Sequence, residues 1–236
     1  MIKKIIGILA VVVLVFVGVW GYGWYKGKTA PSLPDTAVIS EGEEVAYFAG
    51  GCFWCTESDY EKLSGVKEAV SGYMGGNVEN PSYNQVVKGD TGHRETVKVI
   101  YDPNKITYRR LALELFRETD PTDSGGTFYD RGHQYTSAIY YQSDEEKEIA
   151  EEVIKDLEEL GVFDKPIATS VEPAGTFWVA EEYHQDYYKK SSVPYKYYRS
   201  GSGRDDFIES VWGGGEYDYL FEDLEENVVG SRWENY

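Results

Sequence analysis

The sequence predicts an α+β domain, with a mixed and mostly antiparallel sheet, packed helices and long loops, preceded by one N-terminal transmembrane helix. Segments that alternate like strands and segments with helical periodicity follow each other in mixed order. Glycine-rich loops are too numerous for a regular doubly wound sheet. Residues 5–25 contain no charged side chain, although the rest of the chain is highly charged.

The individual elements follow from local patterns. Strands are expected where apolar residues alternate or cluster before glycine or Asp-Pro breaks, at Val45–Ala49, Val66–Tyr73, Glu95–Tyr101 and Ser137–Gln142. Helices are expected at Cys52–Leu63, Tyr108–Arg117 and Ser143–Leu160. The last helix is the clearest, with a capping box of Ser143 and Glu146, a stop at Gly161, and one apolar face formed by Ile149, Val153, Leu157 and Leu160. Together these elements predict a ferredoxin-like two-layer sandwich with long loops.

The uncharged segment from Ile5 to Tyr25 is 21 residues long. A helix of that length spans roughly 30 Å, the hydrocarbon thickness of a bilayer. Aromatic residues gather at its C-terminal end, as at a membrane interface. We therefore predict an uncleaved single-pass anchor over residues 1–25, with a cleaved signal peptide as the alternative. The slight excess of positive charge before the segment favours an extracytoplasmic domain, joined to the anchor through a Pro-containing linker at 26–43.

The 236 residues carry a formal net charge of −18, and 42% of them are hydrophobic. This composition is that of a folded protein, and the negative charge argues against nucleic acid as a partner. The C-terminal tail, residues 213–236, is acidic, and it is interpreted either as an interaction tail or as a solvated extension. With two cysteines and three histidines, no metal site is predicted.

The most informative segment runs Gly50-Gly51-Cys52-Phe53-Trp54-Cys55. A strand ends, two glycines turn the backbone and a helix begins at Cys52, where free backbone N–H groups would stabilise a thiolate and lower the pKa of the thiol. Cys55 lies one helical turn further on, within potential disulfide reach. The pair fits a nucleophile with a resolving partner, but also a thioredoxin-like dithiol or two small buried apolar residues.

Three downstream segments complete a pattern with GGCFWC, namely TGHRETVKVIYDP, YDRGHQYTSAIYY and AEEYHQDYY. In this order and spacing the chain resembles the A-type peptide methionine sulfoxide reductases over about residues 44–212, which makes this segment the expected catalytic domain. The resemblance implies reduction of the S-epimer of methionine sulfoxide, free or in proteins. It also implies an external thiol reductant such as thioredoxin and no other cofactor. We expect a monomer.

The resemblance also assigns roles to individual residues. Cys52 matches the nucleophile, and Phe53 and Trp54 match the aromatic pair that holds the methyl group. Glu95 matches the acid, whose pKa an apolar pocket would raise. Two tyrosines and an aspartate match groups that bind the sulfoxide oxygen or orient the site, namely Tyr83, Tyr135 and Asp130.

The sequence departs from the family pattern at two points. Position 55 is cysteine where glycine is usual, and no cysteine follows it. The resemblance then implies that Cys52 sulfenic acid condenses with Cys55 to a disulfide, which an external dithiol reopens.

Other interpretations remain open at this point. A membrane-tethered thiol–disulfide oxidoreductase would use the same Cys-x-x-Cys, although its bulky central residues argue against that class. A non-catalytic membrane-proximal binding domain would not need Cys52, Glu95, Tyr83 and Tyr135. His133 and His184 are expected to be hydrogen-bonding scaffold. The late aromatic cluster is expected to pack over the site or the core, and it comprises Tyr183, Tyr187, Tyr188, Tyr195, Tyr197 and Tyr198.

Overall fold

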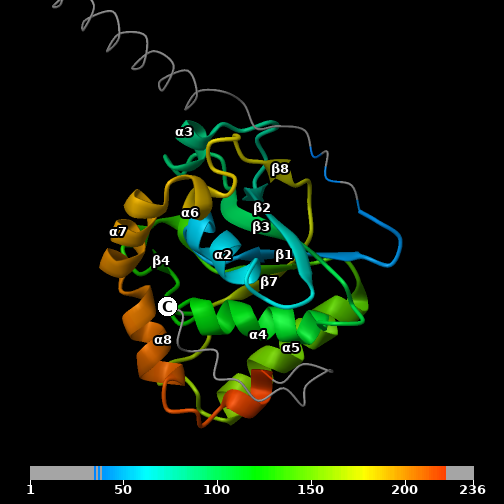
Figure 1. Ribbon diagram of the computed structural model, residues 1–236, viewed down its shortest axis with the longest axis vertical. Coiled ribbons are helices and arrows are strands. Elements are labelled where there is room, and N and C mark those ends of the chain that lie inside the picture. Colours follow the sequence, from blue (N-terminus) through cyan, green and yellow to red (C-terminus); the bar gives the residue numbers. More distant parts are fainter. Residues whose placement is uncertain (1–34, 36, 38, 222–236) are drawn as a thin grey trace, which may run out of the picture.

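A six-stranded sheet forms the centre of the chain in this computed structural model, which describes residues 35, 37 and 39–221 (Figure 1). The spatial order is β7 (Ser170–Pro173), β6 (Ala138–Tyr141), β1 (Glu44–Ala49), β3 (Arg94–Tyr101), β2 (Val66–Met74) and β8 (Trp178–Val179). Neighbouring strands are antiparallel except the parallel pair β6 and β7. The order β6-β1-β3-β2, with antiparallel neighbours, is the ferredoxin-like arrangement.

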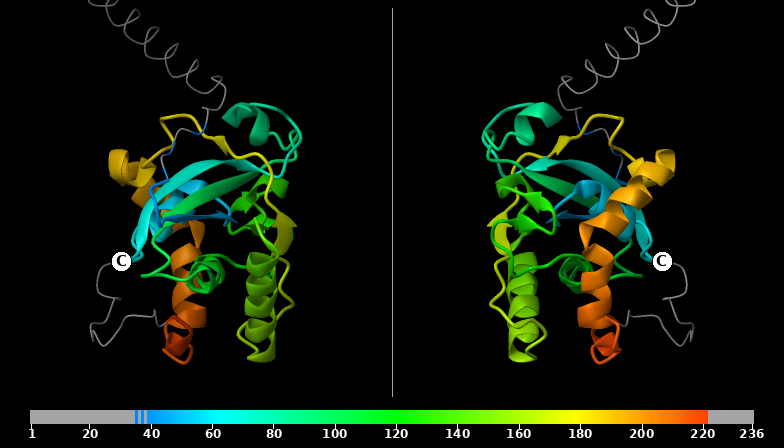
Figure 2. Two further views of the ribbon diagram at one scale, coloured as in Figure 1. Left: turned by 90° about the vertical axis from the view of Figure 1, so that its right-hand side faces the viewer. Right: turned by 90° about the vertical axis from the view of Figure 1, so that its left-hand side faces the viewer.

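Three helices cover one face of this sheet: α2 (Phe53–Tyr60), α4 (Tyr108–Glu118) and α5 (Asp144–Glu159). Strand residues such as Phe48 and Val97 are fully buried against helix residues such as Leu111 and Val153. In Figure 2 the green helices α4 and α5 and the orange α8 extend from the same side of the sheet. A smaller cluster of buried apolar residues lies on the opposite face, and it includes Phe177 from the loop between β7 and β8. The sheet thus has one thick and one thin apolar layer.

The remaining elements lie outside the six-stranded sheet and the three helices that cover it. They are α3 (Tyr83–Val86), β4 (Gly126–Thr127), β5 (Asp130–Arg131), η1 (His133–Tyr135), α6 (Tyr187–Lys190), α7 (Ser192–Ser202), α8 (Arg204–Trp212) and η2 (Asp218–Phe221). The sequence did not predict α6, α7 or α8, because their tyrosine-rich and glycine-containing segments lack a clear apolar period.

The predicted elements occur close to their expected bounds, and α5 shows the local reasons. The Ser143 hydroxyl accepts a hydrogen bond from the Glu146 amide at 3.1 Å. The Glu146 carboxylate accepts a hydrogen bond from the backbone amide of Gln142. In a capping box the donor would be the amide of the N-cap residue, Ser143, which is one residue later. Val153 and Leu157 are buried as predicted, whereas Leu160 is 43% exposed beyond the end of the helix.

The prediction of a transmembrane helix is corrected. Within the described part of the chain, no helix has the length and apolar composition needed to cross a bilayer. The longest one, α5, has 16 residues, mostly charged, and spans about 24 Å. The predicted segment, residues 5–25, lies outside the described residues. The fold is therefore an α+β domain, and the membrane anchor and the extracytoplasmic location that depended on it are not retained.

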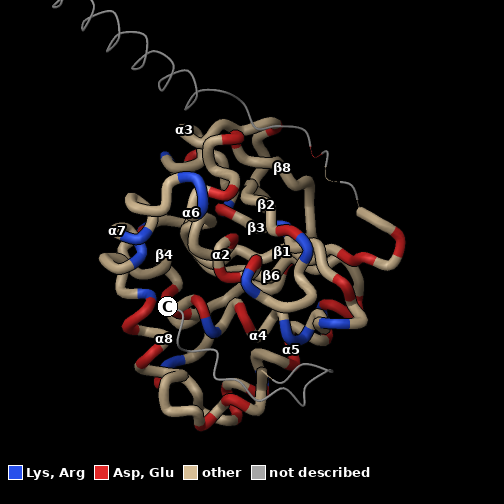
Figure 3. Tube along the Cα trace, in the orientation of Figure 1, with Lys and Arg blue, Asp and Glu red and all other residues tan. Residues whose placement is uncertain are grey.

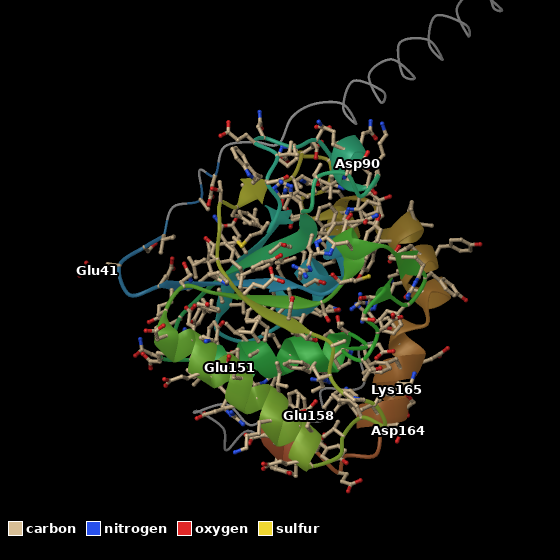
Figure 4. All side chains as sticks on the ribbon, turned by 180° about the vertical axis from the view of Figure 1, so that it is seen from behind. Glu41, Asp90, Glu151, Glu158, Asp164 and Lys165 are labelled. Atoms are coloured by element: carbon tan, nitrogen blue, oxygen red, sulfur yellow. The ribbon has the colours of Figure 1, made fainter. Side chains whose placement is uncertain are left out.

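Acidic residues are spread over many elements of the described domain rather than gathered at one place (Figure 3). Figure 4 shows several of them pointing outward at the periphery, among them the labelled Glu41, Asp90, Glu151, Glu158 and Asp164. The first part of the predicted acidic tail packs on the domain, since Tyr217, Leu220 and Phe221 contact the main core. Residues 222–236 lie outside the described residues.

Candidate active site

The turn that follows β1 presents Cys52 at the start of α2. Gly51 has φ = 87°, and a Cβ atom there would lie 2.7 Å from the Cβ of Thr127, so only glycine fits. The Gly50 carbonyl accepts hydrogen bonds from the Thr119 hydroxyl and the Arg204 guanidinium, both at 3.0 Å. Cys52 is the N-cap residue of α2, and its carbonyl accepts from the Cys55 amide at 3.1 Å. The sharp turn is therefore fixed from two sides.

Cys52 opens into a cavity of about 70 Å³. Since a water molecule occupies about 30 Å³ in the liquid, this space matches a group of a few heavy atoms. The lining side chains come from seven different elements or turns and are Cys52, Phe53, Trp54, Tyr83, Glu95, Asp130, Tyr135 and Tyr198. The cavity thus brings together every site residue predicted from the sequence except Cys55, and it adds Tyr198. Cys55 is fully buried and does not line the cavity.

Glu95 enters the cavity from β3 and is 2% exposed. One carboxyl oxygen accepts a hydrogen bond from the Phe53 amide at 3.0 Å. Burial is the largest influence on this group and raises the pKa of Glu95 well above its usual value, whereas the Phe53 bond acts in the opposite direction. Burial dominates and favours the protonated form of the carboxyl, in which its second oxygen can act as an acid.

Two tyrosine hydroxyls face the same cavity. Tyr83 is positioned by the capping box of α3, in which Ser82 and Gln85 form hydrogen bonds with each other. The backbone amide of Tyr83 also donates a hydrogen bond to the Glu181 carboxylate at 2.9 Å. Tyr135 ends η1, and its carbonyl accepts from the Thr127 hydroxyl at 2.8 Å. Burial raises the pKa of both phenols, and the two hydroxyls share a hydrogen bond. Both groups therefore stay protonated and available as donors.

Tyr198 from α7 closes the cavity on a further side. Its hydroxyl donates to the Asp130 carboxylate, which lies 68 residues earlier in the chain. Burial raises the pKa of Asp130, whereas the bond from Tyr198 lowers it. The sequence placed Tyr198 in a cluster of six tyrosines, and nothing local distinguishes it from its neighbours.

An aromatic wall completes the site. The Trp54 indole donates to Nδ1 of His184 at 3.0 Å and stacks on Tyr187, with ring centroids 3.9 Å apart. The His184 ring also lies 4.8 Å from Phe53 and 4.4 Å from Tyr83. His184 is therefore an organising side chain for the two predicted methyl-binding aromatics, which agrees with the scaffold role expected for it.

The electrostatics of the two thiols differ from the sequence prediction. Burial raises the pKa of Cys52 well above its ordinary value, and the hydrogen bond with Cys55 and the nearby Glu95 and Asp130 act in the same direction. The hydrogen bond with Cys52 lowers the pKa of Cys55 to about 7, helped by Arg204. In the resting pair the negative charge is therefore favoured on Cys55.

Three carboxylates outside the cavity have the spacing of a cation site. Ligand oxygens of Glu57, Glu61 and Asp186 lie within 4.8 Å of one another. The Lys189 ammonium lies 2.5 Å from Glu61 and 2.8 Å from Asp186. Glu57 accepts hydrogen bonds from Ser71 and from the Asp186 amide. The Lys189 ammonium and the hydrogen-bond donors of Ser71 and Asp186 therefore already interact with the carboxylates of this cluster.

Comparison with known proteins agrees with this geometry. Residues 44–215 match the family described as peptide methionine sulfoxide reductase. A Vibrio cholerae protein named peptide methionine sulfoxide reductase MsrA/MsrB is 49% identical over 188 residues, which are 80% of this chain and 49% of that protein. This chain therefore spans about half the length of that relative. The Bacillus subtilis peptide methionine sulfoxide reductase MsrA is 48% identical over 176 residues, covering 74% of this chain and 99% of the relative.

Solved structures show the same similarity. Reduced Mxr1 from Saccharomyces cerevisiae superposes with a TM-score of 0.63 at 32% identity, covering 68% of this chain and 92% of that one. Methionine sulfoxide reductase A of Corynebacterium diphtheriae superposes with a TM-score of 0.58 at 32% identity, covering 65% and 77%.

Proposed function

The chain belongs to the peptide methionine sulfoxide reductase family, and we propose that the Cys52 cavity carries the reaction of this family. That reaction is the thiol-dependent reduction of methionine sulfoxide to methionine. The observation that supports the assignment is the convergence of a thiol, a buried carboxyl and two phenols on one small, aromatic-walled space. The proposed substrate is the S-epimer, free or within a polypeptide, with its methyl group against Phe53 and Trp54.

In the first step the Cys52 sulfur attacks the sulfoxide group of the substrate. The sulfoxide oxygen accepts hydrogen bonds from Tyr83 and Tyr135 and a proton from Glu95, because a sulfoxide is a poor electrophile until its oxygen is protonated. The proton that Cys52 shares with Cys55 passes to Cys55 as Cys52 attacks. The oxygen transfers to Cys52, which becomes a sulfenic acid, and the substrate sulfur gains two electrons and leaves as methionine.

In the second step Cys55 resolves the sulfenic acid. Its sulfur forms a bond to the Cys52 sulfur, the S–O bond breaks, and the hydroxyl leaves as water with the Cys55 proton. A dithiol then reduces the disulfide, and thioredoxin is the proposed physiological reductant. Because Cys52 lines the cavity and Cys55 is fully buried, the dithiol attacks Cys52. Cys55, with the lower pKa, is also the better leaving thiolate.

An epimer-resolved assay tests the proposal. The enzyme and dithiothreitol are mixed with the separated S and R epimers of a methionine sulfoxide peptide, and methionine is quantified. We expect turnover of the S-epimer only. Cys52→Ala should abolish it, and peptide mapping after treatment with sulfoxide alone should show a Cys52–Cys55 link. Near-wild-type turnover by Cys52→Ala, or normal thioredoxin-dependent turnover by Cys55→Ser, would overturn the assigned roles.

A further inference from the structure

Arg94 is a buried arginine at the start of β3, directly before the proposed acid Glu95. Consecutive side chains of a strand point to opposite faces of a sheet. Glu95 lines the Cys52 cavity, whereas Arg94 contacts Tyr140, which belongs to the smaller apolar cluster on the opposite face. The Arg94 side chain is 9% exposed and is not among those that line the cavity. Arg94 therefore acts on the cavity, if at all, through its neighbours.

The guanidinium of Arg94 joins β3 to three other segments. Its Nε donates a hydrogen bond to the hydroxyl of Thr136, the residue that caps the C-terminal end of η1, at 2.8 Å. Its Nη1 donates to the Tyr140 hydroxyl on β6 at 2.9 Å and to Oε2 of Glu172 on β7 at 3.2 Å. Its Nη2 lies 3.1 Å from Oε1 of Glu172. The carboxylate thus matches the charge of the arginine, and Nε is left to hold η1.

The bond to Thr136 is part of a short chain of contacts around Tyr135. The Thr136 hydroxyl, which accepts from Arg94, donates to the His133 carbonyl at 2.8 Å. The His133 ring in turn donates from Nε2 to the carbonyl of Gly92, two residues before Arg94, at 3.0 Å. The start of β3 and η1 are therefore bonded to each other at two points, one on each side of Tyr135.

These two bonded segments carry two of the groups that act on the sulfoxide oxygen in the proposed reaction. Glu95 follows Arg94 on β3, and Tyr135 precedes Thr136 at the end of η1. Both side chains line the cavity. The contact between Arg94 and Thr136 consequently links the backbone that carries the acid to the backbone that carries the phenol.

We propose that Arg94 is a positioning residue for sulfoxide reduction, which holds the Tyr135 hydroxyl in place relative to the Glu95 carboxyl through its bond to Thr136. This inference rests on the proposed function, because both groups must meet the same sulfoxide oxygen. A displacement of about 1 Å in such an arrangement can lower a rate by roughly 100-fold. Arginine suits this role, since its planar guanidinium directs Nε and Nη donors to different partners, whereas a lysine ammonium is a single point charge.

The test measures methionine formation in single turnovers without reductant, over a range of S-epimer concentrations. Thr136→Val removes the acceptor for Nε while nearly keeping the shape of the side chain, and Thr136→Ser keeps the hydroxyl. For Thr136→Val we expect the maximal rate to fall about ten-fold and the half-saturating concentration to stay within about two-fold of wild type, because the phenol contact strengthens as the S–O bond breaks. Thr136→Ser should match wild type.

Two further variants separate the Nε bond from the charge of Arg94. Arg94→Lys keeps a cation for Glu172 but cannot occupy the positions of Nε and both Nη atoms, so we expect about the same ten-fold loss as in Thr136→Val. Glu172→Gln removes the ion pair but leaves the Nε bond to Thr136, and Glu172 is 38% exposed and outside the cavity. Glu172→Gln should therefore keep the wild-type rate.

A Tyr135→Phe background distinguishes positioning from a general loss of structure. Once the hydroxyl is absent, its position no longer matters, so Thr136→Val and Arg94→Lys should each lower the remaining rate by less than about two-fold. A structural disturbance of the cavity would lower the rate by the same factor in both backgrounds. Circular dichroism and urea unfolding confirm that each variant is folded.

Equal losses with and without the Tyr135 hydroxyl would overturn the inference, as would wild-type rates in both Thr136→Val and Arg94→Lys. Loss of rate in Glu172→Gln equal to that in Arg94→Lys would assign the effect to the ion pair and also contradict it. If Thr136→Val does not fold, Arg94→Lys alone and combined with Tyr135→Phe decides. Absence of methionine from the wild-type enzyme, or its undiminished formation by Cys52→Ala, would instead overturn the proposed function.

Discussion

Glu95 acts as an acid only while it holds its proton, and its surroundings favour that state. The carboxyl lines the same cavity as Phe53, Tyr83 and Tyr135, with a single backbone donor at 3.0 Å. Burial raises the pKa of Glu95 well above its usual value. One oxygen can therefore accept from the Phe53 amide while the other carries the proton toward the sulfoxide.

Glu95→Gln keeps the acceptor for Phe53 and removes the acid. We expect the rate of methionine formation to fall by roughly 100-fold or more. Wild-type turnover should decline as pH rises through the raised pKa of Glu95, because the protonated form is the active one, and the variant should lose this dependence. Single-turnover rates across pH measure both effects, with Glu172→Gln, outside the cavity, as the control. A Glu95→Gln rate within ten-fold of wild type would exclude the acid role.

At this scale the sequence predicted most of the cavity but not its full chemistry. Each predicted side chain except Tyr83 lies within a recognisable segment such as GGCFWC or GHQY. Tyr198 has no such segment, since its contact with Asp130 joins α7 to the β4–β5 hairpin. The sequence predicts a lowered pKa for Cys52 from the helix N-terminus, whereas its burial, which raises that pKa, is not visible in the sequence.

Helix α2 is held in place by a buried carboxylate on its second turn. Glu57 is 1% exposed and accepts hydrogen bonds from the Ser71 hydroxyl on β2 and from the Asp186 amide just before α6. Burial is the largest influence and raises the pKa of Glu57 to about 8, although both hydrogen bonds act in the opposite direction. The element that carries both cysteines is thus anchored by a group that titrates near neutrality.

Because the folded pKa of Glu57 lies above the unfolded value, its contribution to stability is full below about pH 4.5 and decreases as pH rises through about 8. Glu57→Gln mimics the protonated form. We expect the free energy of unfolding of wild type, relative to this variant, to fall with a slope of up to about 1.4 kcal/mol per pH unit between pH 5 and 8. Urea unfolding under reducing conditions at several pH values measures the slope.

Glu148→Gln, an exposed substitution on α5, should leave the pH dependence of wild type unchanged. Parallel curves for wild type and Glu57→Gln from pH 5 to 8 would show that Glu57 does not titrate in this range in the folded state.

Among the elements, those with strong local signals were predicted and those defined by distant contacts were not. The period of α5 and the alternation of β3 are visible in the sequence. Helix α7 depends on contacts such as that of Arg199 with Asp59, which lies 140 residues away. No local pattern encodes such a contact, and tertiary packing supplies most helix stability in folded proteins.

Over the whole molecule, the C-terminal elements return to the helical layer beneath the sheet. Trp212, at the end of α8, packs edge-on against Phe163, Tyr217 and Phe221. The Phe221 carbonyl accepts from Arg110 on α4 at 3.2 Å. The guanidinium carbons of Arg110 and Arg117 lie 5.0 and 5.2 Å from the centre of the Phe221 ring. This contact lies apart from the residues that line the Cys52 cavity.

Phe221→Ala should therefore separate stability from catalysis. Loss of the ring removes apolar burial and two cation–π contacts, for which we expect the free energy of unfolding to fall by about 2 kcal/mol. Methionine formation per folded enzyme should stay within about two-fold of wild type, a change equal to about 0.4 kcal/mol in activation free energy. Tyr219→Ala, in the same segment but 55% exposed, should change stability by less than about 0.5 kcal/mol. A large loss of turnover in folded Phe221→Ala would instead show that this contact is coupled to the active site through α8.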